Sequence, residues 1–172
     1  MKRVGGKLVH RGPIASVRMD TFQYGDGSRA TRQVVVHPGA VGVVAHDDQV
    51  LYMCTQPREP VDEPALLEIP AGKLDVEGET PLQCAQRELA EEIGKSAGDW
   101  RELKSFYTSP GFATERVYLF LATELYDVPR RPSDGERIDV VEIPLTDLDG
   151  AIERCEDAKS LVGLLMLKRL LR

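Results

Sequence analysis

The amino-acid sequence predicts an α+β fold in which mixed β-strands surround one central, acidic helix. Three observations favour this class. Short apolar or alternating runs separated by turn signals dominate the first part of the chain, a helix with clear ends follows, and further strands and two helices complete it. The length of 172 residues fits one domain. The 42% hydrophobic and 29% charged residues argue against disorder, collagen-like repeats and a coiled coil.

The N-terminal half is expected to be mostly β structure. The sequence Gly25-Asp26-Gly27-Ser28 is a turn signal, and Pro38-Gly39 marks a second break. Residues 20–24 either continue the first strand or begin another. The expected strands cover residues 8–19, 31–37, 40–45, 50–55 and 66–69.

The helix that follows has recognisable ends. Thr80 is the candidate N-cap, Pro81 is suited to the first helical position, and Gln83 completes a capping box. Gly94 is well placed to end the helix. Apolar residues recur every three or four positions and are expected to pack on a sheet: Leu82, Ala85, Leu89 and Ile93.

The last third of the chain alternates between strands, loops and helices. A loop at 109–112 and a polar, proline-containing loop at 129–136 interrupt the expected strands. We expect strands at residues 102–107, 116–123 and 138–143, and helices at 145–157 and 160–171.

The charge balance excludes some classes of function. The net charge is −6 and the pI is about 5.2, so a general nucleic-acid or membrane-surface binder is not expected, because both partners are polyanions. The acidity is concentrated: residues 75–92 hold six acids and one base, Arg87. A protein this acidic would need a metal ion to bridge the repulsion if it handles phosphates.

The cysteines and the hydropathy indicate the compartment. Cys54, Cys84 and Cys155 are an odd number with neither a disulfide framework nor zinc-site spacing, so reduced, buried thiols are expected. No apolar run at the N-terminus could act as a signal peptide. The apolar stretch 161–171 is too short to span a bilayer. These features predict a cytoplasmic protein.

The acidic helix carries the candidate chemistry. At 100° per residue, Glu88, Glu91 and Glu92 fall within a sector of about 100°. Like charges at this spacing destabilise a helix, and Arg87 alone does not balance them. Oxygen ligands without nearby His or Cys suit Mg²⁺ or Mn²⁺. On the carboxylates alone, a solvated acidic face is the better explanation.

The segment from Gly72 to Gly94 resembles the Nudix box, the signature of Nudix hydrolases. Two departures occur: six residues instead of five separate Gly72 from Glu79, and Lys95 replaces an aliphatic residue. The insertion precedes the helix, where it costs little, and leaves the register from Arg87 to Glu92 intact. The matching positions are Gly72, Glu79, Arg87, Glu88, Leu89, Glu91, Glu92 and Gly94.

The flanking sequences are similar to the ADP-ribose pyrophosphatase branch of that family. Pro110 lies sixteen residues after Gly94, as is typical of the branch, and residues 36–41, 68–75, 109–112 and 157–160 also look like it. The resemblance implies an α/β/α sandwich around a mixed sheet, with an N-terminal β segment at 1–35 and a hydrolase domain at 36–172.

The activity implied is Mg²⁺-dependent hydrolysis of ADP-ribose, or of a related nucleoside diphosphate sugar, to AMP and ribose 5-phosphate. The same chemistry on a sugar nucleotide, a dinucleoside polyphosphate or a flavin nucleotide is the nearest alternative. A non-catalytic nucleotide sensor is a further alternative, but it predicts a lost metal carboxylate, and Glu88, Glu91 and Glu92 are all present.

The resemblance also implies roles for individual residues. Glu88 and Glu92 would be the central metal ligands, assisted by Glu91 and by the carbonyl of Ala71, and Glu92 is thereby expected to be essential for catalysis. Glu79 and Arg87 would brace the loop against the helix. The general base would come from the acidic loop before the last strand, with Glu136 the first choice and Asp134 the reserve.

The resemblance also implies contacts to the substrate, from residues that lie outside the Nudix box. Arg58, and Arg32 more weakly, would bind phosphate, while a surface arginine is the alternative. Pro57 stands where the branch commonly has an aromatic residue. Phe112 would line the pocket unless it packs in the core. Gly111 and Glu115 complete the expected set. The branch is usually homodimeric through N-terminal strands, which residues 1–30 are long enough to supply.

Overall fold

The computed structural model describes residues 1–131, 135 and 137–172. Its chain forms two compact units. The first comprises residues 1–39 and 107–116, and the second comprises residues 40–106 and 117–172. Each is described by itself below. No helix in the described residues is long and apolar enough to cross a bilayer.

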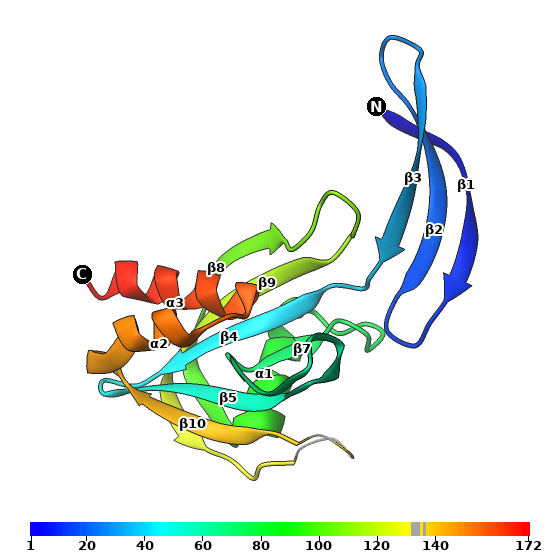
Figure 1. Ribbon diagram of the computed structural model, residues 1–172. Coiled ribbons are helices and arrows are strands. Elements are labelled where there is room, and N and C mark those ends of the chain that lie inside the picture. Colours follow the sequence, from blue (N-terminus) through cyan, green and yellow to red (C-terminus); the bar gives the residue numbers. More distant parts are fainter. Residues whose placement is uncertain (132–134, 136) are drawn as a thin grey trace. The chain divides into compact units, whose positions relative to one another are not determined.

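The first unit contains a three-stranded antiparallel sheet in the order β1-β2-β3 (Figure 1). Its strands are β1 (Lys2–Arg11), β2 (Ser16–Gln23) and β3 (Arg29–Val36). The expectation of one strand over 8–19 is wrong, because the chain reverses at Gly12, whose amide donates to the carbonyl of Ala15 at 2.9 Å. Pro13 has no amide hydrogen and therefore suits this turn.

The second unit is built on a mixed sheet with β10-β5-β4-β9-β8 as its main order. The pair β4·β9 is parallel, whereas β4·β5, β5·β10, β5·β6 and β4·β7 are antiparallel. The strands are β4 (Ala40–His46), β5 (Val50–Arg58), β6 (Glu63–Glu68), β7 (Ala71–Lys73), β8 (Lys95–Tyr107), β9 (Arg116–Asp127) and β10 (Asp139–Pro144).

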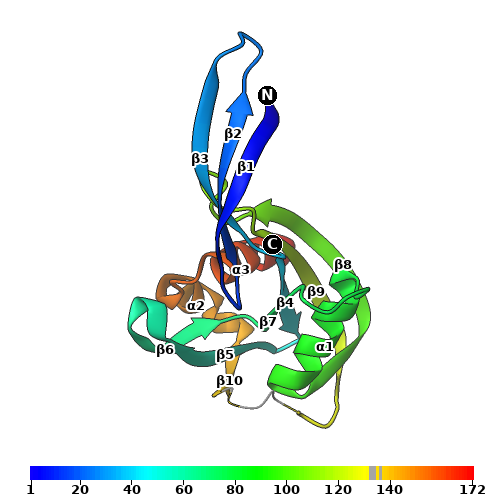
Figure 2. The ribbon, with the colours of Figure 1, turned by 90° about the vertical axis from the view of Figure 1, so that its right-hand side faces the viewer.

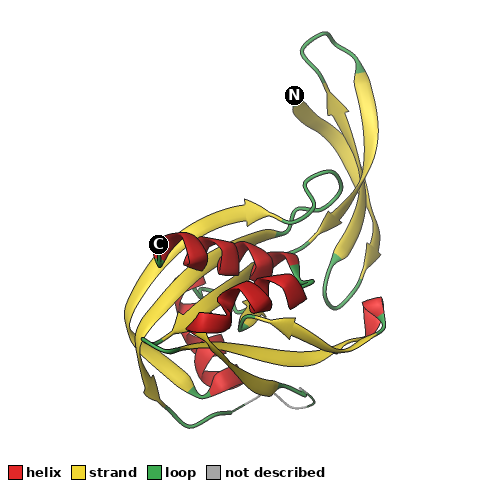
Figure 3. Ribbon diagram, turned by 60° about the vertical axis from the view of Figure 1, so that its left-hand side comes forward, coloured by secondary structure: helices red, strands yellow, loops and turns green. Residues whose placement is uncertain are grey.

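Helices cover both faces of this sheet (Figure 2). Alternate residues of β4 point to opposite faces: Val43 packs with Leu89 of α1 (Pro81–Ile93), whereas Val44 packs with Leu148 of α2 (Leu148–Arg154) and Leu164 of α3 (Ala158–Leu170). Figure 3 shows the α2 and α3 side. The α/β/α sandwich is therefore confirmed.

The ends of α1 are those expected. The Thr80 side chain accepts from the Gln83 amide, the Gln83 side chain accepts from the Thr80 amide, and Gly94 ends the helix with φ 69°. Of the expected apolar stripe, Ala85, Leu89 and Ile93 are buried but Leu82 is 37% exposed.

Among the boundaries that differ from expectation are those of β8, α2 and α3. β8 begins at Lys95, directly after the helix, rather than at residue 102. The helix expected at 145–157 consists of a 3₁₀ turn (Leu145–Asp147) followed by α2. α3 begins earlier, at Ala158, because the Asp157 side chain caps it by accepting from the Ser160 amide. A second 3₁₀ turn (Glu59–Val61) follows β5.

Candidate active site

Three carboxylates contact one arginine on α1 and in the loop before it, and a fourth, Glu92, lies on the same helix. We call Glu79, Arg87, Glu88, Glu91 and Glu92 the α1 acid cluster. Arg87 donates from Nε and Nη2 to the two oxygens of Glu79, at 2.9 and 3.0 Å. Its Nη1 donates to Glu88 at 2.7 Å and to Glu91 at 3.0 Å. The expected Glu79–Arg87 brace is therefore present. The cluster as a whole contains four acids and one base, Arg87.

These contacts shift the ionisation of the brace. The bidentate hydrogen bond to Glu79, together with the charge of Glu88, raises the pKa of Arg87. The hydrogen bond from Arg87 lowers the pKa of Glu79 below its ordinary value. Both groups are therefore fully charged near neutral pH.

Glu92 joins the helix to the first residue of β7. Its side chain is only 3% exposed, and its Oε2 accepts a hydrogen bond from the Ala71 amide at 2.9 Å. The structure thus brings Glu92 beside the residue whose carbonyl is expected to bind metal.

Gly72 is needed for the close approach of this segment to α1. A Cβ atom at Gly72 would lie 1.9 Å from Oε1 of Glu88 and 2.3 Å from its Cγ. Any larger residue would therefore displace the Glu88 side chain. The glycine of the motif thus has a steric reason in this chain, which is to leave room for a candidate metal ligand.

The donor chemistry of the α1 acid cluster fits a hard divalent cation. Glu88, Glu91, Glu92 and the Ala71 carbonyl offer oxygen only, which suits Mg²⁺ or Mn²⁺. As placed in the described part of the chain, no three His, Cys, Asp or Glu side chains form a group that could hold a metal ion. Glu88 and Glu91 are turned to Arg87 instead. Holding a metal ion therefore requires these side chains to reorient.

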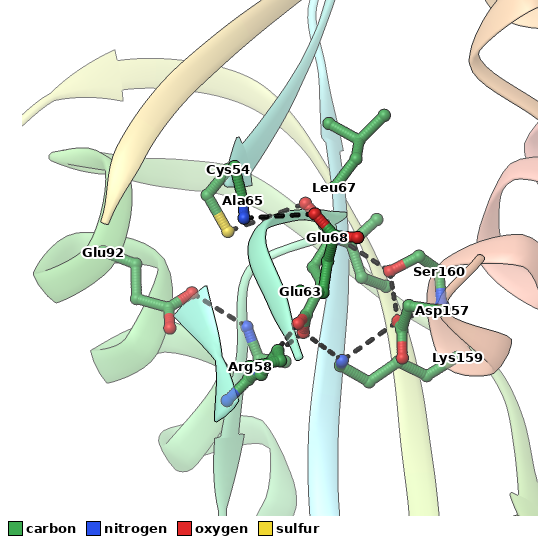
Figure 4. Close-up of polar contacts among 12 residues, drawn as sticks. Cys54, Arg58, Glu63, Ala65, Leu67, Glu68, Glu92, Asp157, Lys159 and Ser160 are labelled. Atoms are coloured by element: carbon green, nitrogen blue, oxygen red, sulfur yellow. Dashed lines mark hydrogen bonds and ion pairs between the residues drawn. The ribbon is translucent and has the colours of Figure 1, made fainter. Parts of the chain in front are cut away.

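A second charged group lies at the start of α3 (Figure 4). We call Arg58, Glu68, Asp157 and Lys159 the Glu68 network. Glu68 is 1% exposed and accepts from Arg58 Nε at 2.5 Å and Nη2 at 2.8 Å. Lys159 Nζ donates to the same carboxylate at 2.5 Å and to Asp157 at 3.0 Å. Two acids and two bases are thus paired.

The ionisation of this network follows from its pairing. Burial would raise the pKa of Glu68, but hydrogen bonds and charges from Arg58 and Lys159 outweigh it and lower that pKa. Burial likewise opposes the charge of Lys159, yet Asp157 and Glu68 raise its pKa. The hydrogen bond to Glu68 raises the pKa of Arg58. All three groups are charged near neutral pH.

The segment from Glu68 to Ala71 connects the two clusters. The Ile69 amide donates to Ser160 Oγ at 2.8 Å, and Ser160 Oγ donates to Asp157 at 2.5 Å. Three residues after Glu68, the Ala71 amide binds Glu92. The first turn of α3 and the end of α1 therefore fix this short segment from two sides.

Four expected substrate contacts belong to the other compact unit. Phe112 is 58% exposed, which excludes core packing, and its carbonyl accepts from the Val35 amide at 2.8 Å. Glu115 accepts from Thr108 Oγ1 at 2.6 Å. Arg32 donates to the carbonyl of Thr31 at 3.0 Å, and Gly111 has open space around its Cα. Arg58 is the expected substrate residue in the same unit as the α1 acid cluster.

The proposed bases Glu136 and Asp134 lie outside the described residues. Just before this loop, Arg130 donates from Nε to the carbonyl of Glu92 at 2.7 Å and from Nη2 to the carbonyl of Ile138 at 2.5 Å. Arg130 therefore links the end of α1 to the chain that leads into β10.

Sequence reasoning missed Glu68, Lys159 and Arg130 as parts of the site. The signal for Glu68 was available, because an acid inside the apolar run 66–69 is costly to bury unless it is paired. Nothing in the spacing of Lys159 or Arg130 indicated their partners, which are distant in sequence.

Comparisons with known proteins agree with this geometry. The NUDIX domain model matches residues 36–162. The chain is 37% identical over 164 residues to an ADP-ribose pyrophosphatase of Bacillus subtilis (strain 168), covering 92% of this chain and 88% of that one. It is 33% identical over 172 residues to a methanol dehydrogenase activator of Bacillus methanolicus, covering 97% and 92%.

A solved structure supports the fold. A crystal structure of an ADP compounds hydrolase superposes with a TM-score of 0.86, covering 99% of this chain and 93% of that chain. The sequence identity is 23%, so this likeness concerns the fold.

Proposed function

The chain belongs to the NUDIX family, and from this premise we propose that it hydrolyses the pyrophosphate bond of ADP-ribose or a related nucleoside diphosphate sugar. With ADP-ribose, water cleaves this bond to give AMP and ribose 5-phosphate. The observation that carries the proposal is the α1 acid cluster, which holds four carboxylates in the register of the family signature, three of them bound to one arginine. The relative from Bacillus subtilis supports this choice of substrate.

The proposed cofactor is Mg²⁺, with Mn²⁺ able to replace it. Glu88, Glu91, Glu92 and the Ala71 carbonyl would hold it. When bound, such an ion neutralises the pyrophosphate and lowers the pKa of a bound water. The protein holds Glu92 and Ala71 together and keeps Glu79 paired with Arg87, so that the loop stays against the helix.

The proposed general base is Glu136, which would accept a proton from the attacking water. Glu136→Gln is expected to lower kcat, while Asp134→Asn tests the reserve candidate in the same assay. An unchanged kcat for Glu136→Gln would contradict this assignment.

The proposed substrate contacts are Arg58 and Arg32 for phosphate and Gly111, Phe112 and Glu115 for the remainder of the nucleotide. The exposed ring of Phe112 supports its role, because an exposed aromatic ring is able to stack on a base or ribose.

Two alternative functions compete with this proposal, one an enzyme with another substrate and one a protein without catalytic activity. One is the same hydrolysis with a sugar nucleotide, a dinucleoside polyphosphate or a flavin nucleotide. The other is a non-catalytic nucleotide sensor, to which the likeness to a dehydrogenase activator gives some support. The sensor predicts a missing carboxylate, and Glu88, Glu91 and Glu92 are all present.

A nucleotide panel separates these functions. Purified protein is incubated with ADP-ribose, GDP-mannose, diadenosine polyphosphates or FAD, with Mg²⁺ or Mn²⁺, and products are separated by chromatography. AMP and ribose 5-phosphate from ADP-ribose, at the highest kcat/KM of the panel, are expected. A higher kcat/KM for another compound would contradict ADP-ribose as the substrate and assign that compound instead. No hydrolysis of any compound would overturn the enzymatic function.

We also propose that the protein is cytoplasmic and binds neither nucleic acid nor membranes. The three cysteines are buried and free, which fits a reducing compartment such as the cytoplasm. No nucleic-acid or membrane partner is expected from the net charge.

We further propose a homodimer formed through the N-terminal sheet. All ten residues of β1 are exposed, including Val4, Leu8 and Val9. Residues 1–39 hold seven Lys and Arg against two acids, whereas residues 40–172 hold 15 against 26. A basic sheet would complement the acidic remainder of a second copy. Sedimentation of a chain lacking residues 1–35 should give a monomer, and a monomeric full chain would contradict the proposal.

A further inference from the structure

Arg58 is held by only part of its guanidinium group. Its Nε and Nη2 bind the two oxygens of Glu68, whereas Nη1 makes no hydrogen bond to any described residue. The side chain of Arg58 is 39% exposed, although Glu68 beneath it is 1% exposed. A guanidinium fixed along one edge presents its remaining donors in a defined direction, which suits an anionic ligand.

Glu68 in turn depends on Lys159. The ammonium group of Lys159 donates to Oε2 of Glu68 and to Asp157, and its side chain is 15% exposed. Lys159 is therefore too enclosed to be a direct substrate contact. Its charge fixes the Glu68 carboxylate on the side opposite to Arg58, as Figure 4 shows.

The Glu68 network lies close to Glu92. In Figure 4 the Glu92 carboxylate lies on the Arg58 side of the network. The charge of Glu92 contributes to the raised pKa of Arg58, and the charges of both Glu92 and Glu68 act on Cys54. Arg58 is thus near Glu92, one of the acids proposed to hold the metal ion.

We propose that Lys159 is a positioning residue for hydrolysis: through Glu68 it holds the Arg58 guanidinium in one orientation, with Nη1 directed to an oxygen of the substrate pyrophosphate. This inference rests on the proposed function. Without the ammonium group, Glu68 keeps its two bonds to Arg58 but loses its anchor on α3. The Arg58–Glu68 pair is then able to shift as a unit, and misplacement of about 1 Å is costly for catalysis.

A double-mutant cycle on kcat/KM tests this chain of contacts. The variants are Lys159→Met, Arg58→Ala and the double substitution, assayed on the best diphosphate substrate of the panel. Lys159→Met keeps the aliphatic stem and removes the charge. It is expected to lower kcat/KM about tenfold in the wild-type background, but less than twofold in the Arg58→Ala background, because its effect passes through Arg58.

Controls separate positioning from general damage to the fold. Lys168→Met removes a lysine from the same helix, where it pairs with the exposed Asp149, and is expected to leave kcat/KM unchanged. Circular dichroism and thermal melts establish that each variant is folded at the assay temperature. If Arg58→Ala does not fold, Arg58→Lys replaces it, since it keeps the charge and loses the bidentate contact.

The outcomes distinguish this proposal from the proposed function. An equal loss from Lys159→Met in both backgrounds, or no loss in the wild-type background, would overturn the positioning role. A wild-type protein without activity on the whole panel would instead overturn the proposed function.

Discussion

The two charged clusters of the second unit, residues 40–106 and 117–172, differ in their charge balance. The Glu68 network pairs two acids with two bases, whereas the α1 acid cluster sets four acids against one arginine. The buried acid of each, Glu68 and Glu92, is almost equally inaccessible, at 1% and 3% exposure. Burial alone therefore does not separate the two clusters.

The difference shows in which cluster the charges are balanced by other residues of the chain. A network with balanced charges is paired within the chain, and its members fix the chain around them. An excess of carboxylates costs folding free energy unless a cation binds to it. We infer that the α1 acid cluster binds the cation, and that the other members of the Glu68 network hold Arg58, a proposed substrate contact, in position.

The largest effect is expected from a loss of charge in the α1 acid cluster. Glu92→Gln should lower kcat by about three orders of magnitude, because a proposed metal ligand is lost. The amide oxygen of Gln is still able to accept from Ala71, so the thermal midpoint should change little. Steady-state rates and melts check both. A variant that retains most of its kcat would show that Glu92 is not a metal ligand.

The next largest effect is on stability, in the Glu68 network. Glu68→Ala leaves Arg58 and Lys159 without their buried partner, and should lower the free energy of unfolding by about 3–5 kcal/mol. Asp149→Ala breaks the exposed pair with Lys168 and should cost about 1 kcal/mol or less. Urea denaturation measures both, and equal costs would contradict the distinction between buried and exposed pairs.

A steric change at the α1 acid cluster should have an intermediate effect on activity. In Gly72→Ala, the new Cβ displaces Glu88, and kcat should fall about 10–100-fold. Gly25→Ala, in the turn between β2 and β3, is the matched control, because no atom lies within 4 Å of its added Cβ. The rates of both variants are compared with their melting temperatures. A fully active Gly72→Ala would show that the position of Glu88 is unimportant.

The smallest effect is the pH dependence of the Glu68 network. The pKa of Glu68 is lowered in the folded state from an ordinary value of 4.5. Its ionised form therefore stabilises the fold fully above that value, and this contribution is lost as pH falls through the lower folded pKa. The stability of the wild type relative to Glu68→Gln should thus decrease between pH 5 and more acidic conditions, as equilibrium unfolding at several pH values can test. A difference that does not vary with pH would contradict the pairing.

Much of this unit was predictable because its determinants are local. The capping box at Thr80, the glycine at the end of α1 and the apolar stretches of β4 and β5 are all short-range patterns. The acidic register of α1 was predictable for the same reason. In the first unit, the turn at Gly12 was missed because the apolar residues on both sides of it resemble one continuous strand.

The Glu68 network was not predictable because it depends on long-range contacts. Glu68 and Lys159 are 91 residues apart, and only the packing of α3 on the sheet brings them together. Arg58 is predicted from the sequence as a phosphate contact, but its hydrogen bonds to Glu68 depend on the pairing of β5 with β6. Single-residue patterns contain no signal for such partners.

Direct binding of Mn²⁺ tests the central claim, that the charge excess of the α1 acid cluster holds a divalent cation. Electron paramagnetic resonance of free Mn²⁺, titrated with wild type, Glu92→Gln and Lys168→Met, needs no substrate. We predict saturable binding to wild type and Lys168→Met, and weakening of at least tenfold in Glu92→Gln. Equal binding by all three proteins, or none by the wild type, would contradict the claim.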